Sequence, residues 1–131
     1  MRRRRILGDD HPDTLVSASN LAVEFRILGR HEQPCALQED TLARWRKVLG
    51  DDHPSTLASA ANLAVDCSVL GEHERARTLH EDTLGRRRRV FGDDHPLARA
   101  SALDLGHELT ALGESELAEA WRIWASDHHA D

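Results

Sequence analysis

Apolar residues recur along the chain at spacings of three and four, a pattern that predicts amphipathic α-helices. One pair of stripes spans residues 12–28 and 31–48, and a matching pair spans residues 54–70 and 76–90. No segment alternates with a period of two, so the sequence predicts no strand. The stripe residues are Leu15, Ala18, Leu21, Ala22, Phe25, Leu28, Leu37, Thr41, Leu42, Trp45 and Val48, then Leu57, Ala60, Leu63, Ala64, Cys67, Leu70, Ala76, Leu79, Thr83, Leu84 and Val90.

An internal repeat of 42 residues organises these helices. The string Gly-Asp-Asp-His-Pro begins at Gly8, Gly50 and Gly92, and residues 8–49 and 50–91 are identical at 25 of 42 positions without gaps. A period of this length is typical of a solenoid, in which each unit of two helices covers the apolar stripe of the next. The predicted divisions are residues 1–7 as the tail of a preceding second helix, 8–49 as repeat 1, 50–91 as repeat 2 and 92–131 as a diverged terminal repeat 3.

The repeated string also predicts where the first helix of each unit begins and ends. The helix should start at Pro12, Pro54 or Pro96, because proline is favoured at the first helical position. The Asp or His just before the proline can cap the helix. A left-handed glycine is expected after each first helix, and the candidates are Gly29, Gly71 and Gly113. Small residues that would let helices approach closely are Ala18, Ala22, Ala60, Ala64, Ala102 and Gly106.

This repeat resembles the tetratricopeptide repeat, in particular the long-period form of kinesin light chains and of many bacterial regulatory proteins. The residues that carry the resemblance are Asn20-Leu21-Ala22, Phe25, Gly29, Leu37 and Leu42, then Asn62-Leu63-Ala64, Gly71, Ala76, Leu79 and Leu84. The resemblance covers essentially the whole chain. It implies an all-α, right-handed α-solenoid of about three helix-turn-helix repeats. Three departures are Pro34, where the family usually has alanine, Cys67, where it usually has an aromatic residue, and Asp104, where the other units have asparagine.

The resemblance further implies that a peptide or protein segment binds along a concave face lined by the first helices. Carried over residue by residue, that face presents Asn20, Val23, Arg26 and Ile27, then Asn62, Val65, Ser68 and Val69, then Asp104, His107, Thr110 and Ala111. These positions lie beside the apolar stripe at helical spacing. An asparagine side chain both donates and accepts hydrogen bonds, so it can hold a peptide backbone of any sequence. The alternative is that Asn20 and Asn62 only satisfy neighbouring helices.

Composition narrows the choice of partner. The chain has 131 residues, enough for one ordinary domain, with 17 basic and 23 acidic residues and a formal net charge of -6. A negative balance argues against general nucleic-acid binding, and 4% aromatic residues without tyrosine make a base-stacking platform improbable. The arginine run Arg86 to Arg89 is predicted to be a solvated helix end, where the helix dipole favours cations.

The sequence also predicts no membrane segment. No apolar run approaches the roughly 18 residues that a membrane span needs. The arginines after Met1 resemble the start of a signal peptide, but Gly8, Asp9 and Asp10 stand where its apolar stretch should be. We therefore expect a cytoplasmic protein.

Nine histidines raise the question of a metal site, and the pattern favours none. His11, His53 and His95 recur once per unit, and stacked hairpins about 10 Å apart cannot share one ion. Capping is the favoured role for these three. His73 and His80 lie two turns apart on one helix but have no evident third ligand. Asp127-His128-His129 and Asp131 also form a chelating pattern, in a C-terminal segment that we expect to fray.

Catalytic patterns and cofactor motifs are absent from the sequence. Cys35 and His31 are four residues apart on a helix, as a nucleophile and a base could be, but no third group orients them. In the repeat register, Cys35 corresponds to Arg77 and Glu119, which indicates an exposed and variable position. We therefore predict a non-enzymatic protein without a cofactor.

The two ends of the chain suggest a second function class. Residues 2–8 repeat the pattern of residues 86–92, and Trp121 and Trp124 lie on a last helix that no further hairpin follows. Apolar stripes at both ends favour head-to-tail self-association, which need not close into a ring. The alternative function is therefore self-assembly, or service as the sensor arm of a larger regulator such as a nucleotide-switch ATPase, through open repeat ends.

Overall fold

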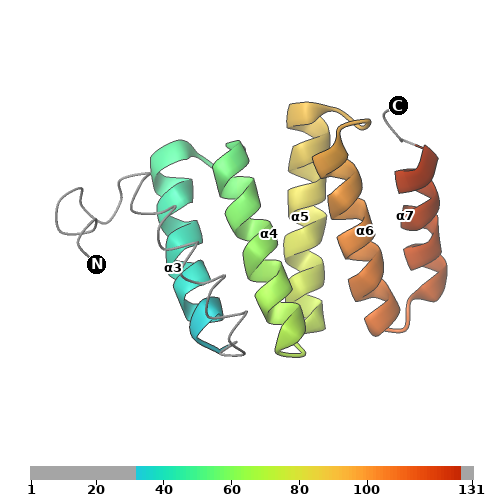
Figure 1. The fold of residues 1–131 in the computed structure, drawn as a ribbon, viewed down its shortest axis with the longest axis horizontal. Helices are drawn as coiled ribbons and strands as arrows, with labels where there is room; N and C mark the ends of the chain where they lie inside the picture. The colour runs from blue at the N-terminus through green and yellow to red at the C-terminus, as the bar shows by residue number, and fades with distance from the viewer. Residues whose placement is uncertain (1–31, 128–131) are drawn as a thin grey trace.

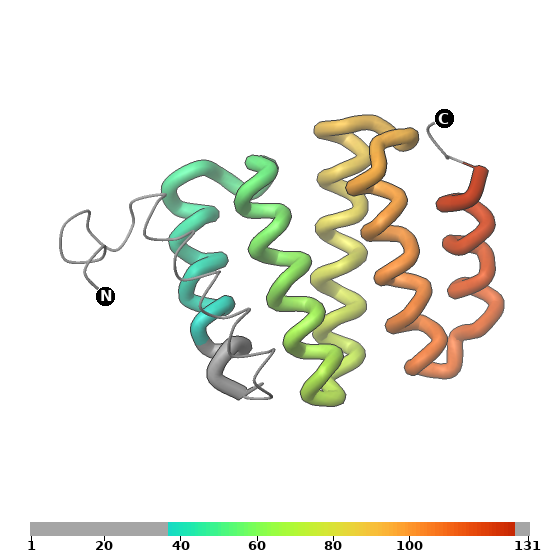
Figure 2. The backbone as a smooth tube through the Cα atoms, viewed as in Figure 1, coloured from blue at the N-terminus to red at the C-terminus, as the bar shows by residue number. Residues whose placement is uncertain are grey.

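The computed structural model describes residues 32–127, with side chains from residue 37 onward, as five helices joined by short connectors. Each helix lies beside the next in chain order and the chain reverses direction at every connector (Figures 1 and 2). No strand occurs in this part of the chain. The helices are α3 (Glu32–Leu49), α4 (Pro54–Val69), α5 (His73–Phe91), α6 (Pro96–Ala111) and α7 (Ser115–Asp127).

The predicted all-α solenoid is confirmed. Among the described helices, each packs mainly on its neighbours in chain order, which is the packing of a stack of repeats. In the 42-residue register of the sequence, α4 and α5 correspond to the second unit, α6 and α7 to the third, and α3 to the second helix of the first unit. Helices α3, α4 and α5 span nearly the residues that the hydrophobic pattern predicts, and α6 begins at the predicted Pro96.

Proline and histidine start the first helices of the second and third units. Pro54 and Pro96 are the first helical residues, and His53 and His95 are the N-caps. The Nδ1 atom of each histidine accepts a hydrogen bond, 3.1 Å long, from the backbone N–H two residues later. The recurring histidine is thus a capping residue in both units, as predicted, while His11 lies outside the described residues.

Glycine ends these two helices. Gly71 and Gly113 have φ angles of 83° and 84°, in the left-handed region that glycine adopts without steric cost. The N–H of the following residue, Glu72 or Glu114, donates to a carbonyl five residues back at 2.8 Å in both units. This is a Schellman ending, which satisfies carbonyls that would otherwise be left unpaired. Gly29 lies outside the described residues.

The core divides into two clusters, one for each step of the stack. The first contains Leu42, Ala60, Leu63, Ala64, Cys67 and Ala76, and the second contains Leu84, Ala102, Leu105, Leu109, Ala118 and Ala125. Both clusters combine leucines with alanines that are wholly buried. The small side chains let the helix backbones approach closely, so that the leucines of each unit are covered by the next.

Three residues of the predicted stripes are exposed instead of buried. Val48 and Val90 lie in the last turns of α3 and α5, and Leu70 is the C-cap of α4. The last turn of a helix lies beside a connector rather than between two packed helices, so its apolar residues remain in contact with solvent. The stripe pattern predicted the buried face correctly but overestimated its length.

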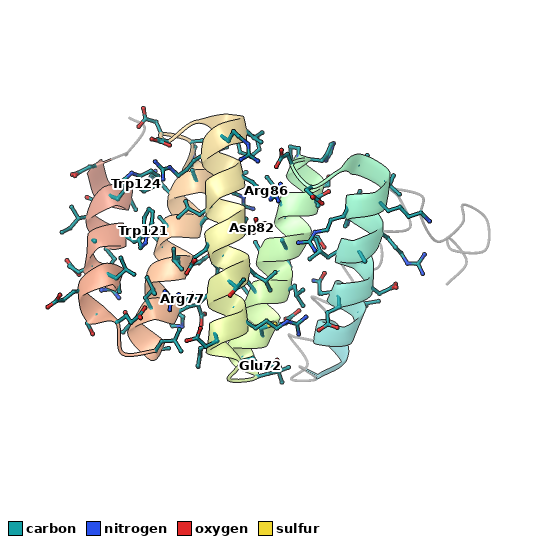
Figure 3. All side chains as sticks on the ribbon, turned by 180° about the vertical axis from the view of Figure 1, so that it is seen from behind. Glu72, Arg77, Asp82, Arg86, Trp121 and Trp124 are labelled. Carbon is teal, nitrogen blue, oxygen red and sulfur yellow. The ribbon has the colours of Figure 1, made fainter. Side chains whose placement is uncertain are left out.

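The two tryptophans of the last helix pack inward. Trp121 and Trp124 are partly buried against the second core cluster and meet each other edge to face with ring centroids 5.7 Å apart. Arg88 of α5 lies over the Trp124 ring, 5.0 Å from its centroid. These side chains therefore bind α7 to its own unit and to α5 rather than forming an open apolar stripe (Figure 3).

We expect Leu105→Ala to lower the free energy of unfolding by about 2–5 kcal/mol, because Leu105 is 2% exposed in the second cluster and its removal leaves a cavity. The matched control is Leu103→Ala on the same helix, where the side chain is 48% exposed and the loss should be below about 1 kcal/mol. Urea denaturation followed by circular dichroism measures both. Equal losses for the two variants would contradict the packing described above.

Candidate functional site

A groove of about 200 Å³ lies between α4 and α6, with α5 contributing to its floor. We call it the inner groove. It is lined by Val65, Ser68 and Val69 of α4, His80 of α5, and Asp104, His107 and Glu108 of α6. Two first helices and the second helix between them therefore form one surface.

Five of the residues predicted to bind a partner meet in this groove. Val65, Ser68 and Val69 lie on one face of α4 because residues three and four apart in a helix are neighbours. Asp104 and His107 lie on the corresponding face of α6. The 42-residue register places these faces opposite one another, so residues far apart in the sequence share one site.

Other predicted site residues lie elsewhere. Asn62 is half-buried and does not line the inner groove. Thr110 donates its hydroxyl to the Gly106 carbonyl and accepts a hydrogen bond from Arg122, at 2.9 Å and 2.7 Å. Neither Thr110 nor the exposed Ala111 lines the inner groove. Asn20, Val23, Arg26 and Ile27 lie outside the described residues.

Two groove residues, His80 and Glu108, were missed in the sequence. His80 belongs to a second helix, whereas the prediction used only first helices. Glu108 stands four residues after Asp104 and so shares its helix face, a spacing that could have identified it. Both side chains are 2% exposed, which is unusual for polar residues and indicates specific surroundings.

Glu108 joins the second and third units. Its Oε2 atom lies 2.8 Å from Nδ1 of His73, the first residue of α5. Nδ1–H donates to the carboxylate, which removes part of the cost of burying the acid. This contact fixes the N-terminal turn of α5 against the groove face of α6.

Burial favours the neutral form of the His80 ring. Burial lowers the pKa of its imidazole, and the positive Arg87 and nearby His107 lower it further, while the carboxylates of Asp104 and Glu108 oppose the shift. Its Nδ1 atom has no hydrogen-bond partner among the described residues. The floor of the inner groove thus contains a neutral ring with an unsatisfied nitrogen.

The prediction that the whole arginine run is solvated is wrong for Arg87, which is buried. Its side chain is 6% exposed and its guanidinium donates to Ser101 Oγ at 2.9 Å. Burial lowers the pKa of Arg87, and the negative charge of Asp104 acts in the opposite direction. In the repeat register Arg87 replaces the buried Trp45, so the position lies in the interior of the stack whatever residue occupies it.

The remaining arginines of the run are neutralised within the protein. Asp52, in the connector before α4, accepts hydrogen bonds from Arg86 at 2.7 Å and from Arg89 at 2.9 Å. Hydrogen bonding to Arg86 is the main cause of the lowered pKa of Asp52. Arg88 donates to Asp93 at 2.9 Å. These ion pairs tie the end of α5 to the connector before α4 and to the connector after α5. The charged groups of Arg86, Arg88 and Arg89 therefore already have partners within the protein.

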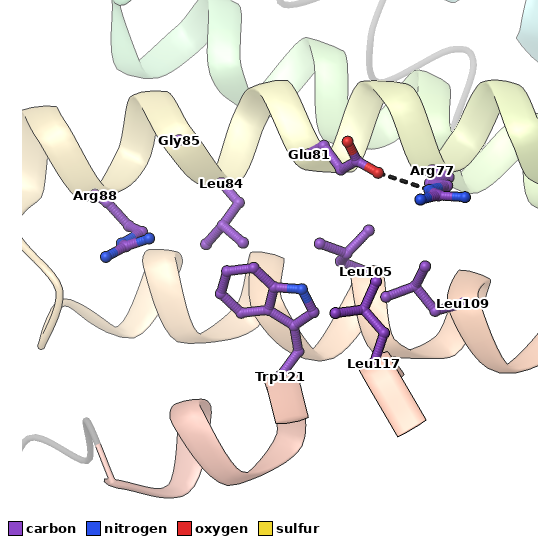
Figure 4. A pocket seen from close by; sticks show the side chains of 9 residues that line it. All are labelled: Arg77, Glu81, Leu84, Gly85, Arg88, Leu105, Leu109, Leu117 and Trp121. Atoms are coloured by element: carbon purple, nitrogen blue, oxygen red, sulfur yellow. Dashed lines mark hydrogen bonds and ion pairs between the residues drawn. The ribbon is translucent and has the colours of Figure 1, made fainter. Parts of the chain in front are cut away.

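A second hollow, of about 360 Å³, lies among α5, α6 and α7. We call it the tryptophan pocket (Figure 4). Its apolar lining is Leu84, Leu105, Leu109, Leu117 and Trp121, and its charged residues are Arg77, Glu81 and Arg88. Arg77 donates to Glu81 at 2.7 Å, and Arg88 is paired with Asp93. Its charged groups thus already have partners, and it offers mainly apolar surface.

Within residues 32–127, no three histidine, cysteine, aspartate or glutamate side chains gather closely enough to hold a metal ion. The described helices also include none with the length and apolar character needed to cross a membrane. The Cys35 side chain, His31 and the histidines of the C-terminal tail lie outside the described side chains.

A sequence profile of the tetratricopeptide repeat matches residues 23–87 and 58–121, which overlap and together span most of the chain. The chain belongs to the tetratricopeptide repeat family. Tetratricopeptide repeats are generally scaffolds for protein–protein interaction and typically non-catalytic. No curated protein matches the chain.

Solved structures with the same fold include repeats of the kinesin light chain type. BtubC (BKLC) from P. vanneervenii is similar with a TM-score of 0.88 and 20% identity over 96% of this chain. A kinesin-light-chain-like protein of Podospora anserina with nearly identical TPR-like repeats gives a TM-score of 0.83 at 26% identity over 96% of this chain. A single-substitution variant of it gives 0.85 with the same identity and coverage. The chain spans 50% of the BtubC chain and 60% of the Podospora chain.

The buried His80 predicts a pH dependence of stability. Since its pKa is lower in the folded protein, the unfolded chain binds more protons around and below about pH 6.5, and stability falls on acidification. We expect His80→Gln to lose less unfolding free energy than the parent between about pH 7.5 and about pH 5.5. Urea denaturation at both pH values provides the measurement. A difference between the two pH values that is unchanged by the substitution would show that His80 contributes nothing.

Proposed function

We propose that this tetratricopeptide repeat protein is a non-catalytic interaction module whose inner groove binds an extended segment of a peptide or protein. The observation that supports the proposal most is the meeting of five predicted binding residues in one groove. Their positions follow from the first helices of two successive units, and the groove is the surface that those helices share.

The groove offers both kinds of contact that an extended segment needs. Val65 and Val69 present apolar surface on one wall. The hydroxyl of Ser68 and the ring nitrogens of His107 can hydrogen-bond to the amides and carbonyls of a peptide backbone. Backbone contacts of this kind supply affinity, while the apolar wall and the groove floor select the side chains.

The test is to obstruct the groove. Val69 is 48% exposed at its wall, so Val69→Trp should leave the fold intact and reduce capture of peptides by about tenfold or more, ~1.4 kcal/mol. An unbiased peptide array probed with the labelled full chain measures capture. The matched control is Ile123→Trp on α7, where the native side chain is 54% exposed and lies outside the groove. Capture that is unaffected by Val69→Trp would refute the proposal.

A second candidate function, self-association, is supported by apolar residues that remain exposed on the last helix. Leu117 and Ile123 of α7 are both largely accessible. As the tryptophans pack inward, these two residues are the apolar side chains that α7 offers to a second copy. Light scattering should show a mass that rises with concentration, and the double substitution Leu117→Ser and Ile123→Ser should lower it to that of a monomer. A concentration-independent monomeric mass would exclude this candidate.

A further inference from the structure

We propose that the inner groove selects a segment carrying a lysine or arginine side chain, with the cation lying against Asp104 and the aliphatic stem against Val65 and Val69. This inference rests on the proposed function, because it specifies the chemistry of the segment that the groove binds. It goes beyond that function by assigning a charge preference to the site.

The charge of the groove is the first argument. Two carboxylates, Asp104 and Glu108, line it, and no lysine or arginine does. Glu108 is paired with His73, whereas Asp104 is half-buried and forms no hydrogen bond or ion pair with any described residue. The equivalent residue 42 positions earlier is the neutral Asn62. The third unit therefore presents a negative group at a position where the preceding unit has an amide.

His80 provides the second, independent argument. The ring is 2% exposed, lines the groove and has a nitrogen without a hydrogen-bond partner in the described part of the chain. A neutral imidazole has one ring nitrogen that accepts a hydrogen bond. It therefore suits an N–H donor such as an ammonium or guanidinium group. A protonated ring at the same place would repel that group.

The positive charge nearest to the groove does not cancel this preference. Arg87 lies two turns after His80 on α5, where its guanidinium donates to Ser101 Oγ at 2.9 Å and to the Leu97 carbonyl oxygen at 3.4 Å. It is not among the residues that line the groove. Its single charge offsets at most one of the two carboxylates that line the groove. The net charge of -6 for the whole chain acts in the same direction on an approaching cation.

The dimensions of the groove suit one long side chain. Its volume, about 200 Å³, is below the roughly 300 Å³ at which pockets for whole small molecules begin. Lysine and arginine cover apolar surface with their methylene stems and place the charge at the far end. A stem along Val65 and Val69 therefore directs the cation across the groove toward α6 and Asp104.

The experiment uses arrays of immobilised nonapeptide pools in which the central residue is fixed as Arg, Lys, Gln, Leu or Glu and the other positions are degenerate. The probe is the labelled full chain. We expect the Arg and Lys pools to retain about fivefold more protein than the Gln and Glu pools, the advantage of one ion pair in a partly buried site. Asp104→Asn, which introduces the residue of the preceding unit, should remove most of this preference.

Two further variants separate the site from general electrostatics. His80→Gln introduces the residue found 42 positions earlier, Gln38, and should weaken retention of the Arg and Lys pools by a few fold. Glu116→Gln removes the same charge from an exposed position on α7 and should leave the preference unchanged. With the parent protein alone, retention of the Arg pool should fall several-fold between about 50 mM and about 500 mM NaCl.

The outcomes distinguish failure of the charge preference from failure of segment binding itself. Peptide capture that Val69→Trp abolishes but that shows no preference for Arg and Lys overturns the charge inference and leaves the proposed function in place. No capture from any pool overturns both. A preference that survives Asp104→Asn, or that Glu116→Gln reduces equally, overturns the inference because the selection would then arise from the overall charge. A salt-independent retention of the Arg pool overturns it as well.

Discussion

Burial of each helix's apolar stripe against the next helix is the interaction on which this molecule depends. A single pair of helices has no interior of its own, so the leucines of one unit are sheltered only when the following unit is in place. Ala64 and Ala102, both wholly buried, keep the helices close enough for this to happen. The same close contact places α4 and α6 on either side of α5 and so creates the inner groove.

Polar contacts between residues far apart in the sequence add defined partners to this apolar packing. The pair His73 and Glu108 and the pair Asp52 and Arg86 join residues 35 and 34 positions apart. One pair lies at the start of α5 and the other in its final turns, so both ends of the helix are tied to neighbouring segments. A hydrophobic contact tolerates sliding, whereas hydrogen bonds with defined partners restrict the register of one unit against another.

The inner groove contains residues on a helix face that the repeat provides and two residues that differ from their equivalents 42 positions earlier. Val65, Ser68 and Val69 lie on the face of α4 that lines the groove. Asp104 and His80 each differ from the residue 42 positions earlier, which is Asn62 for Asp104 and Gln38 for His80. A repeat scaffold can thus acquire a selective site through one or two substitutions, because the surrounding surface is already provided by the stack.

The resemblance to the repeat family indicated five of the residues that line the inner groove. The sequence by itself determined the helices of the 42-residue repeat, the histidine caps and most of the core. These features depend on periodicity and on local chemistry, such as His53 before Pro54, which act within a few residues. Only the tertiary structure decided that His80 reaches the groove floor, that Arg87 is buried and that Trp121 turns inward. Periodicity identifies the face of a helix, but the neighbour that covers each position comes from another unit or helix. Burial and hydrogen bonding at these positions therefore depend on contacts that no local pattern contains.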